Sequence, residues 1–468
     1  MENFWDSSVW GVIMIFAFLL GALLAGNSLK RKIPFLKNSL IPASVLGGTI
    51  LIIIAAIYKG VTGEVMFDTE LFNGAGTAYL EMITYHTLAL GFIASTLKIS
   101  NSHLNKQRTV EIVNTGITTV ATYLIQGIFG LAITMIAALV LKDFFAAAGM
   151  ILPFGYGQGT GQAMNYGNIY ETEYGFVGGK SFGLTIAALG FLSASFGGVI
   201  HLNIMKKKGK LNIKGSKDAL NTELVEGNDE VPMQESLDKM SIQIALVFTA
   251  YGLTYLVMHL LGLLIPGMKS TIYGFNFLLG VLCATLVKFA TRLLRKKNIM
   301  HREYINNFLL TRTSNFFFDV MIVSGIAAIR LDILEKYWGI ALIIGGAGLV
   351  VTYVYNRIVA KVLFKNYTEE QFLAMYGMLT GTASTGIILL REIDGDFKTP
   401  AADNLVYQNF PAILLGFPML ILATLAPKNT VLTLIIIIAY FIVLNIFLFR
   451  DFIFKKRTKN SGKDDKTE

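Results

Sequence analysis

The segment that most constrains the fold is GYGQGTGQAMN, residues 155–165, because it lies in a chain built almost entirely from long apolar runs. Each of its four alternating glycines disfavours helix by about 1 kcal/mol relative to alanine. Irregular backbone at membrane depth persists only where protein or a water-filled cavity surrounds it. A similar segment, GMLTGTASTG, covers residues 377–386. Such paired Gly-interrupted segments indicate the binding site of a transporter.

The composition indicates an integral membrane protein, since 54% of the 468 residues are hydrophobic and only 15% are charged. A soluble domain is usually about 25% charged. Runs long enough to cross a bilayer as helix predict eleven spans, of which we expect the first to be uncleaved. They lie at residues 9–27, 40–58, 77–97, 112–141, 178–203, 242–265, 271–291, 306–329, 338–361, 404–426 and 430–449.

The distribution of positive charge predicts the orientation of the chain. Of the 40 Lys and Arg residues, 31 lie in alternate loops and 7 in the intervening ones. The positive-inside rule therefore places the N-terminus outside and the C-terminus in the cytoplasm. The same distribution explains the net charge of +9 without nucleic acid as a partner. Cys283 is the only cysteine, which excludes a disulfide within the chain.

The two glycine-rich segments fit this topology only as re-entrant hairpins, at about residues 144–170 and 372–391. The first would enter from outside and the second from the cytoplasm. We expect two repeats of inverted topology, an all-α membrane fold in which residues 1–203 form the first repeat and residues 241–429 the second. Residues 204–240 would be a cytoplasmic linker, and residues 430–468 an extra helix with a basic cytoplasmic tail.

Short motifs resemble those of the sodium/glutamate symporter family. They are Ile41-Pro42-Ala43, Gly47-Gly48, Gly159-Thr160-Gly161, Tyr174-Gly175-Phe176 and Gly197-Gly198. The resemblance extends over nearly the whole chain in span order and loop placement. It implies a homodimer in the bacterial cytoplasmic membrane that couples amino-acid uptake to sodium, with glutamate as the default solute.

The chain departs from the pattern of that family in both hairpins. Gln158 stands where the family has a histidine, and residues 381–385 read GTAST without the family's proline. Arg391 and Glu392 follow the second hairpin, where a milder polar sequence is expected. The fold assignment survives these departures, whereas the identity of the solute does not.

Hydroxyl and carbonyl oxygens at the two hairpins are the candidate sodium ligands, because broken helices free their backbone carbonyls. Alternatively, these hydroxyls cap helix ends and bond their own backbone. The candidate sodium ligands are Thr160, Thr380, Gly381, Thr382 and Asp319.

The candidate solute-binding residues gather around the starts of the two half-helices, where exposed N–H groups and the helix dipole favour a carboxylate. Their amide side chains would bind a polar headgroup or bridge the hairpin to neighbouring helices. The candidates are Gln158, Gly159, Thr160, Gly161, Gln162, Asn165, Thr382, Ser384, Thr385, Arg391 and Asn409.

Two charged residues have alternative structural explanations. Arg391 could clamp a carboxylate in two contacts, or it could be the solvated cytoplasmic end of the hairpin. Asp319 lies within an apolar span, where an ionisable group indicates function. Arg312 and Asn315 share its helical face, so that an ion pair or hydrogen bond within the bundle is the alternative.

Taken together, these patterns predict a secondary active transporter, with sodium-coupled symport of glutamate or a related amino acid or organic anion. The alternatives are a channel or facilitator for a small solute, a proton-coupled carboxylate transporter, and a sensor that keeps the fold without transport. The sequence shows no nucleophile–base motif, metal motif or P-loop. We therefore expect neither an enzyme nor a cofactor, and no metal besides the coupling sodium ion.

Overall fold

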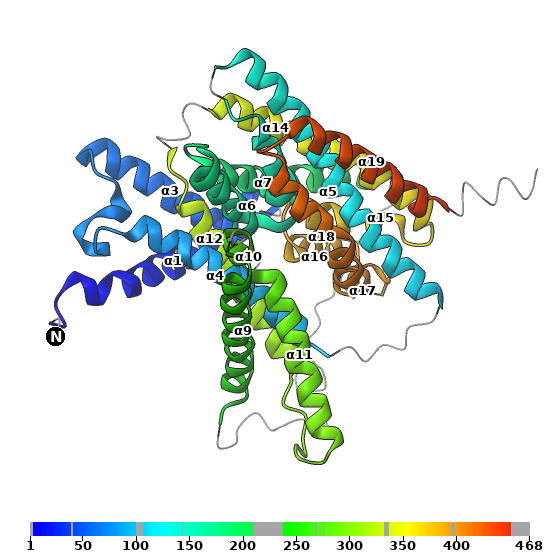
Figure 1. The fold of residues 1–468 in the computed structure, drawn as a ribbon, viewed down its shortest axis with the longest axis horizontal. Helices are drawn as coiled ribbons and strands as arrows, with labels where there is room; N and C mark the ends of the chain where they lie inside the picture. Colours follow the sequence, from blue (N-terminus) through cyan, green and yellow to red (C-terminus); the bar gives the residue numbers. More distant parts are fainter. Residues whose placement is uncertain are drawn as a thin grey trace, which may run out of the picture.

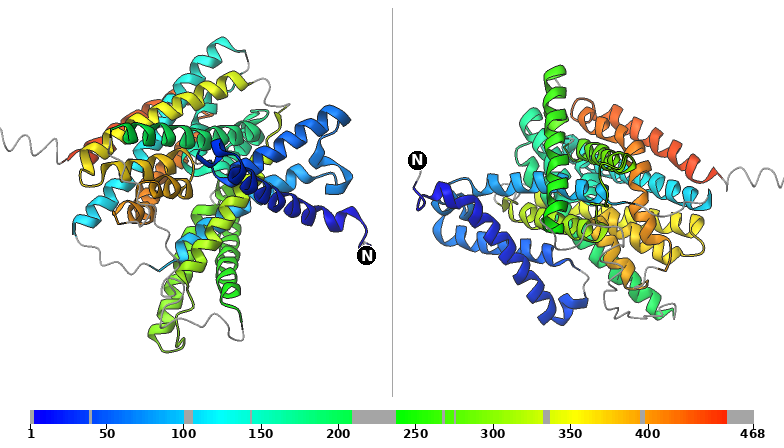
Figure 2. Two further views of the ribbon diagram at one scale, coloured as in Figure 1. Left: turned by 180° about the vertical axis from the view of Figure 1, so that it is seen from behind. Right: turned by 90° about the horizontal axis from the view of Figure 1, so that it is seen from below.

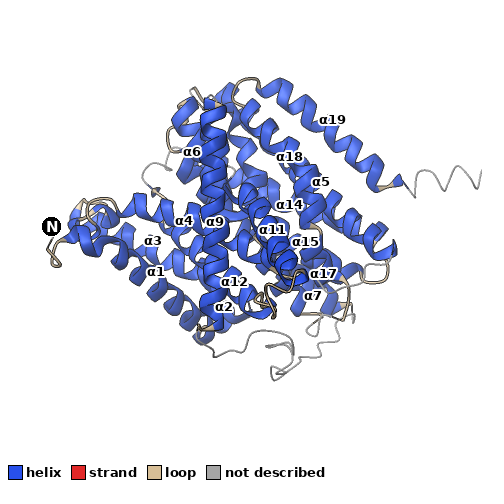
Figure 3. Cartoon of the chain, turned by 60° about the horizontal axis from the view of Figure 1, so that its bottom comes forward, coloured by secondary structure: helices blue, strands red, loops and turns tan. Residues whose placement is uncertain are grey.

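Helices make up the ordered secondary structure of the protein (Figure 3). The computed structural model describes residues 3–38, 41–99, 106–142, 144–208, 237–266, 269–274, 276–331, 337–394 and 398–450. No strand occurs among these residues. Eight of their helices are long and apolar enough to cross a membrane, and the pair α17 (Ala401–Tyr407) and α18 (Asn409–Leu425), bent by 50°, would make a ninth. The chain is therefore an all-α, multi-pass membrane protein.

The helices pack in two groups. The first group, hereafter the scaffold bundle, takes three long helices from each half of the chain. Its members extend to the left and the bottom of Figure 1. They are α1 (Ser7–Lys32), α3 (Ala43–Thr62), α4 (Gly76–Leu97), α9 (Lys239–Leu264), α11 (Asn276–Lys296) and α12 (Asn307–Ala327), with α2 (Pro34–Asn38), η1 (Met66–Asp68), η2 (Glu70–Phe72) and α10 (Lys269–Gly274) beside them.

The second group, hereafter the hairpin bundle, contains both glycine-rich segments. Its members α5, α18 and α19 lie on the right of Figure 1 and α14 lies at the top, and Figure 2 shows the same separation from behind and from below. Besides α17 and α18, the bundle contains α5 (Lys106–Val140), η3 (Ala146–Ile151), α6 (Leu152–Tyr174), α7 (Gly179–Lys207), α14 (Trp338–Leu363), α15 (Thr368–Thr380), α16 (Ala383–Arg391) and α19 (Thr430–Leu448).

Contacts between helices come in matched sets from the two halves. Helix α1 packs on α3 as α9 packs on α11, and α3 packs on α12 as α11 packs on α4. In the hairpin bundle, α7 packs on α14 as α18 packs on α5. The central contacts, α4 with α12 and α5 with α14, each join one helix from either half. Two repeats of inverted topology stay a prediction, with which these contacts agree.

Several helix ends follow from local sequence. The side chains of Asp238, Asn306 and Asn429 accept hydrogen bonds from the first backbone N–H groups of α9, α12 and α19, as N-cap residues do. Helix α1 ends in Lys30, Arg31 and Lys32, whose charges complement the negative end of the helix dipole. Ile33 is the C-cap, and Pro34 after it disfavours helix at that residue.

Each of the eleven predicted spans coincides with a helix or a helix pair, but two of these helices are less apolar than a lipid-facing span. They are α4 and α12, which are absent from the eight apolar helices found in the described part of the chain. Both lie at the centre of the scaffold bundle and contact each other and α6. Their inner faces carry buried hydroxyls such as Thr84 and Ser324, whose oxygens lie 2.8 Å apart. Burial against protein explains the lower apolarity of the two helices.

Parts of the predicted linker and tail lie outside the described residues. These parts are residues 209–236 of the linker and residues 451–468 of the tail. The predicted boundaries between the repeats fall at the end of α7 and the start of α9.

Candidate functional site

The first glycine-rich segment folds back on itself at Gly159. Within α6 this residue has φ 77° and ψ −166°, a conformation that is essentially confined to glycine. The rings of Phe154 and Tyr166, on either side of it, stack with their centroids 4.1 Å apart. In one continuous helix their Cα atoms would lie about 18 Å apart. Residues 152–158 and 160–174 are therefore two arms of a hairpin, hereafter hairpin 1.

The second segment forms a hairpin from α15 and α16, hereafter hairpin 2. The two helices pack closely on each other, and a Cβ on Gly377 would lie 2.8 Å from the Cα of Gly386. The helix breaks at Gly381 and Thr382, and α16 starts at Ala383. Both segments that the sequence assigns to hairpins thus reverse direction. Their positions relative to the membrane stay a prediction.

The tips of the two hairpins meet inside the protein. A Cβ on Gly159 would lie 3.4 Å from Cγ2 of Thr382, and 3.3 Å from the methyl carbon of Met321 on α12. Beside this contact is a cavity of about 120 Å³, hereafter the tip cavity. A water needs roughly 10–15 Å³ measured in this way, so the tip cavity has room for a small solute.

Both polar and apolar groups line the tip cavity. The polar lining comes from α4, α5, both tips and the joint between α17 and α18; the apolar lining is dominated by aromatic rings and methionines. The polar residues are Ser95, Thr119, Tyr123, Gln158, Thr382, Gln408 and Asn409, and the aromatic and Met residues among the others are Phe92, Phe154, Phe277, Phe318, Met378, Phe417 and Met419.

Two amide oxygens at the tip cavity have no hydrogen-bond partner within the described part of the chain. They are Oε1 of Gln158 and Oε1 of Gln408, whose side chain is only 1% exposed. Nε2 of Gln408 donates to Oδ1 of Asn409 at 3.1 Å and to Sδ of Met378 at 3.4 Å, so the unpaired end of this amide is its oxygen. An unpaired buried acceptor costs about 1–3 kcal/mol, which a solute that donates to it would recover.

The start of α16 opens onto the same cavity through Thr382 and Ala383. The first N–H groups of any helix lack intrahelical partners and lie at its positive end. Thr382 is the N-cap, yet its side chain does not cap the helix, and its hydroxyl instead lies 3.4 Å from Oγ1 of Thr385. The tip of hairpin 2 therefore suits a carboxylate.

Thr160 joins the tip of hairpin 1 to the scaffold bundle. Its hydroxyl donates to the carbonyl of Met321 at 3.1 Å, and the residue is fully buried. Gly325, one turn further along α12, makes room for it, because a Cβ there would lie 2.6 Å from Cβ of Thr160. In this conformation the Thr160 hydroxyl holds two helices together.

The remaining predicted hydroxyls and glycines lie at or near the tips. The hydroxyl of Thr380 donates to the carbonyl of Tyr376 at 2.6 Å, and the Gly381 backbone forms the break between α15 and α16. Gly161 packs on Leu88 of α4. The side chain of Ser384 lies outside the described residues.

Four predicted residues lie apart from the tip cavity. Arg391 is exposed at the opposite end of α16, and Asp319 lies beside Ser44 at the start of α3. Asn165 donates to the carbonyl of Gly274 at 2.6 Å. Gln162 is fully buried with neither end of its amide paired inside the described ranges, but it does not line the cavity.

Three of the residues predicted from the sequence line the tip cavity. They are Gln158, Thr382 and Asn409.

The alternative ion pair of Asp319 with Arg312 does not form in the described structure. The guanidinium of Arg312 lies over the ring of Phe308, 5.1 Å from its centroid. Asp319 instead faces the N-terminal turn of α3, where the helix dipole favours a negative charge. Its side chain belongs to the contact between two scaffold helices.

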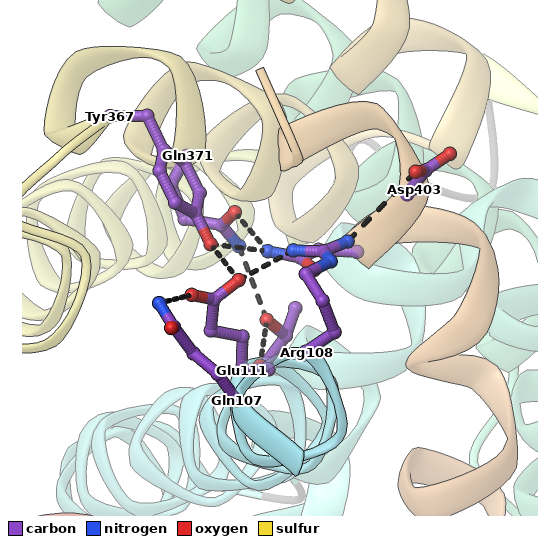
Figure 4. Close-up of polar contacts among 8 residues, drawn as sticks. Gln107, Arg108, Glu111, Tyr367, Gln371 and Asp403 are labelled. Carbon is purple, nitrogen blue, oxygen red and sulfur yellow. Dashed lines mark hydrogen bonds and ion pairs between the residues drawn. The ribbon is translucent and has the colours of Figure 1, made fainter. Parts of the chain in front are cut away.

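A polar network, which the sequence analysis did not predict, holds the base of hairpin 2 (Figure 4). The hydroxyl of Tyr367 donates to Oε2 of Glu111 at 2.8 Å and accepts from Nδ2 of Asn404 at 3.0 Å. Burial raises the pKa of Tyr367, so this hydroxyl stays protonated and donates. Arg108 pairs with Glu111 and reaches Asp403 at 3.9 Å. The network ties α15 to α5 and α17.

A second network holds α15 to α14 and α7, which both contact it. Glu369 accepts from both terminal nitrogens of Arg357 on α14 at 2.6 Å each, and its Oε2 lies 2.8 Å from Nε2 of His201 on α7. Such bidentate pairs fix orientation as well as distance. Near the tip, Nε2 of Gln126 donates to the carbonyl of Leu379 at 2.9 Å. Hairpin 2 is thus fixed at both ends in this conformation.

Comparison with known protein families and with curated proteins finds no match for this chain. The resemblance to sodium/glutamate symporters therefore rests on the motifs and the span order, and it stays a prediction. The geometry of the tips is independent of that resemblance.

Proposed function

We propose that the protein is a secondary active transporter that couples uptake of a small amino acid or organic anion to a cation, most simply sodium. The observation that carries the proposal is the meeting of two broken helices, at Gly159 and Thr382, beside a cavity large enough for a solute. Broken helices whose ends converge inside a membrane protein are typical of secondary transporters.

The two ends of each broken helix favour opposite charges. At hairpin 2, the positive N-terminus of α16 faces the tip cavity, while the last carbonyls of α15 lie on the other side of the break. Those carbonyls, the Gly381 backbone and the hydroxyls of Thr380 and Thr382 supply oxygen atoms of the kind that hard cations bind. An anion and a cation can therefore bind at one tip, where each stabilises the other.

The division into two bundles supports alternating access. Hairpin 1 is the part of the hairpin bundle that contacts α4 and α12 of the scaffold bundle most closely, and Thr160 makes its buried hydrogen bond to α12. Movement of one bundle against the other would carry the tip cavity between the two sides of the membrane. We further propose that the scaffold bundle forms a homodimer in the cytoplasmic membrane, with the N-terminus outside.

Joint stabilisation by solute and sodium tests the proposal. A ligand that binds only the folded state raises its stability, and two ligands that favour the same state bind more tightly together than alone. The thermal unfolding of purified protein is measured with a panel of small acids, in sodium chloride and in choline chloride. We expect a larger shift of the midpoint in sodium. Equal shifts in both salts would contradict sodium coupling, and no shift with any acid would contradict the binding site.

A channel or facilitator would also bind its solute, so it is distinguished by energetics. A coupled transporter accumulates solute above equilibrium, whereas a facilitator only equalises it. Proton coupling is distinguished by an imposed pH gradient that drives uptake in the absence of sodium.

A further inference from the structure

We propose that the solute of the tip cavity is a zwitterionic amino acid with an uncharged, apolar side chain. This inference rests on the proposed function and narrows the solute within it, away from glutamate. Three parts of the cavity match three parts of such a molecule: a helix N-terminus for the carboxylate, two amide oxygens for the ammonium group, and an apolar wall for the side chain.

The carboxylate would bind at the start of α16. Thr382 and Ala383 present the first turn of this helix to the tip cavity, and its backbone N–H groups are donors without intrahelical partners. The buried Gln408 side chain lines the same cavity with an unpaired oxygen. A donor surface and an acceptor therefore lie at one site, as a zwitterion requires.

The ammonium group would bind to the oxygens of Gln158 and Gln408. Both are buried acceptors with no partner within the described residues. Their residues line the cavity from two different elements, the tip of hairpin 1 and the joint between α17 and α18. An ammonium group carries three donors, enough to satisfy both oxygens. A plain carboxylic acid would leave both oxygens unpaired.

The side chain would lie against aromatic rings from the scaffold bundle. Phe92 of α4 lies at the centre of this wall, with ring centroids 5.3 Å from Phe277 on α11 and 5.4 Å from Phe318 on α12. All three rings line the tip cavity, and Met378 lies on the hairpin 2 side of the lining. Methionine and aromatic rings adapt to apolar groups of varied shape.

A second carboxylate has no cation to bind in this cavity. Among the described residues that line it, none is Lys, Arg or His. Arg391, the one cation of the predicted site, lies at the far, exposed end of α16. An unpaired carboxylate against aromatic rings would lose its hydration without compensation. Glutamate and aspartate should therefore bind more weakly than leucine or methionine.

Uptake into proteoliposomes under an inward sodium gradient tests this specificity. Labelled leucine, methionine, glutamate and aspartate are compared at equal concentrations, and 4-methylpentanoate, which is leucine without its amino group, is used as a competitor. We expect initial uptake of leucine or methionine to exceed that of glutamate at least about tenfold. Leucine should compete at least about tenfold better than 4-methylpentanoate, because an unpaired buried polar group costs about 1–3 kcal/mol.

Substitution of the two amides tests the contact with the ammonium group. Gln158→Leu and Gln408→Leu should each reduce the preference for leucine over 4-methylpentanoate by about tenfold. Asn168→Leu, on the second arm of hairpin 1 and outside the cavity lining, is the matched control and should keep it. A loss of fold would lower uptake of all solutes without changing the preference. If neither amide variant folds, the two comparisons in the wild-type protein still decide.

Uptake of glutamate equal to or greater than that of leucine would overturn this inference and leave the proposed transport function in place. Equal competition by leucine and 4-methylpentanoate would also overturn it. If no amino acid or organic acid accumulates under either a sodium gradient or a proton gradient, both the inference and the proposed function are wrong.

Discussion

Gly159 and Thr382 lie against each other although they belong to opposite halves of the chain. A Cβ added to Gly159 would be 3.4 Å from Cγ2 of Thr382, and both residues stand at the break of a helix. The contact brings together two reversals of the backbone in the interior of the protein. The tip cavity beside it is the site on which the following predictions depend.

Substitution of Gly159 should disrupt the tip of hairpin 1. Alanine in this conformation costs about 1–3 kcal/mol, so Gly159→Ala is expected to destabilise the protein by that amount and to abolish most solute-dependent stabilisation. Thermal unfolding with and without solute measures both effects. The control is Gly346→Ala on α14, where a Cβ meets nothing within 4 Å and helix propensity predicts unchanged or slightly higher stability. Equal thermal stability of the two variants would show that Gly159 does not need a backbone conformation confined to glycine.

Thr160 should act through its hydroxyl. Thr160→Val keeps the shape but removes the donor to the Met321 carbonyl, whereas Thr160→Ser keeps the hydroxyl. We expect Val to lower the free energy of unfolding by about 1–2 kcal/mol more than Ser does. If the hydroxyl also binds sodium when the hairpin moves, Thr160→Val should raise the sodium concentration needed for half-maximal uptake, and Thr160→Ser should not. Equal sodium dependence in both variants would restrict Thr160 to its structural hydrogen bond.

The charged residues Asp319 and Arg391 should have little effect on the solute site, because both lie apart from the tip cavity. Arg391→Ala is expected to keep initial uptake within about twofold of wild type, since exposed charges contribute little. Asp319→Asn should lower stability through the contact with α3 and leave the sodium dependence of uptake unchanged. A shifted sodium dependence in Asp319→Asn would instead place that carboxylate at a cation site.

The sequence predicted features that depend on neighbouring residues, and it missed contacts between segments that are far apart along the chain. The reversals near Gly159 and Gly381 were predictable because glycine conformation is a local property. The rings of Phe92, Phe277 and Phe318 were not predicted at the cavity, since helix packing between distant segments brings them there. The helical face of Asp319 was known from the sequence, but the helix that this face contacts was not.

The network at the base of hairpin 2 shows the same limit. Glu111 stands out as a charge at the start of a long apolar helix, but Tyr367 and Asn404 are ordinary loop and helix residues in the sequence. Only the packing of α5, α15 and α17 brings them together.

The Tyr367 hydroxyl should stabilise the anchored conformation of hairpin 2. Tyr367→Phe leaves Glu111 without one donor and Asn404 without one acceptor, which is expected to cost about 1–3 kcal/mol. Hydrogen exchange of α15 measures the effect locally. Tyr440→Phe on α19 is the control, because the Tyr440 hydroxyl donates to the carbonyl of Leu415 and not to this network. Unchanged exchange of α15 in Tyr367→Phe would show that the network does not hold the hairpin.

Coupled transport is tested most directly by solute accumulation in proteoliposomes that contain the purified protein. With sodium higher outside, we predict that the internal concentration of labelled leucine rises above the external concentration, and that an ionophore that dissipates the sodium gradient returns it to equality. Accumulation only up to equality, the same with and without the gradient, would contradict secondary active transport.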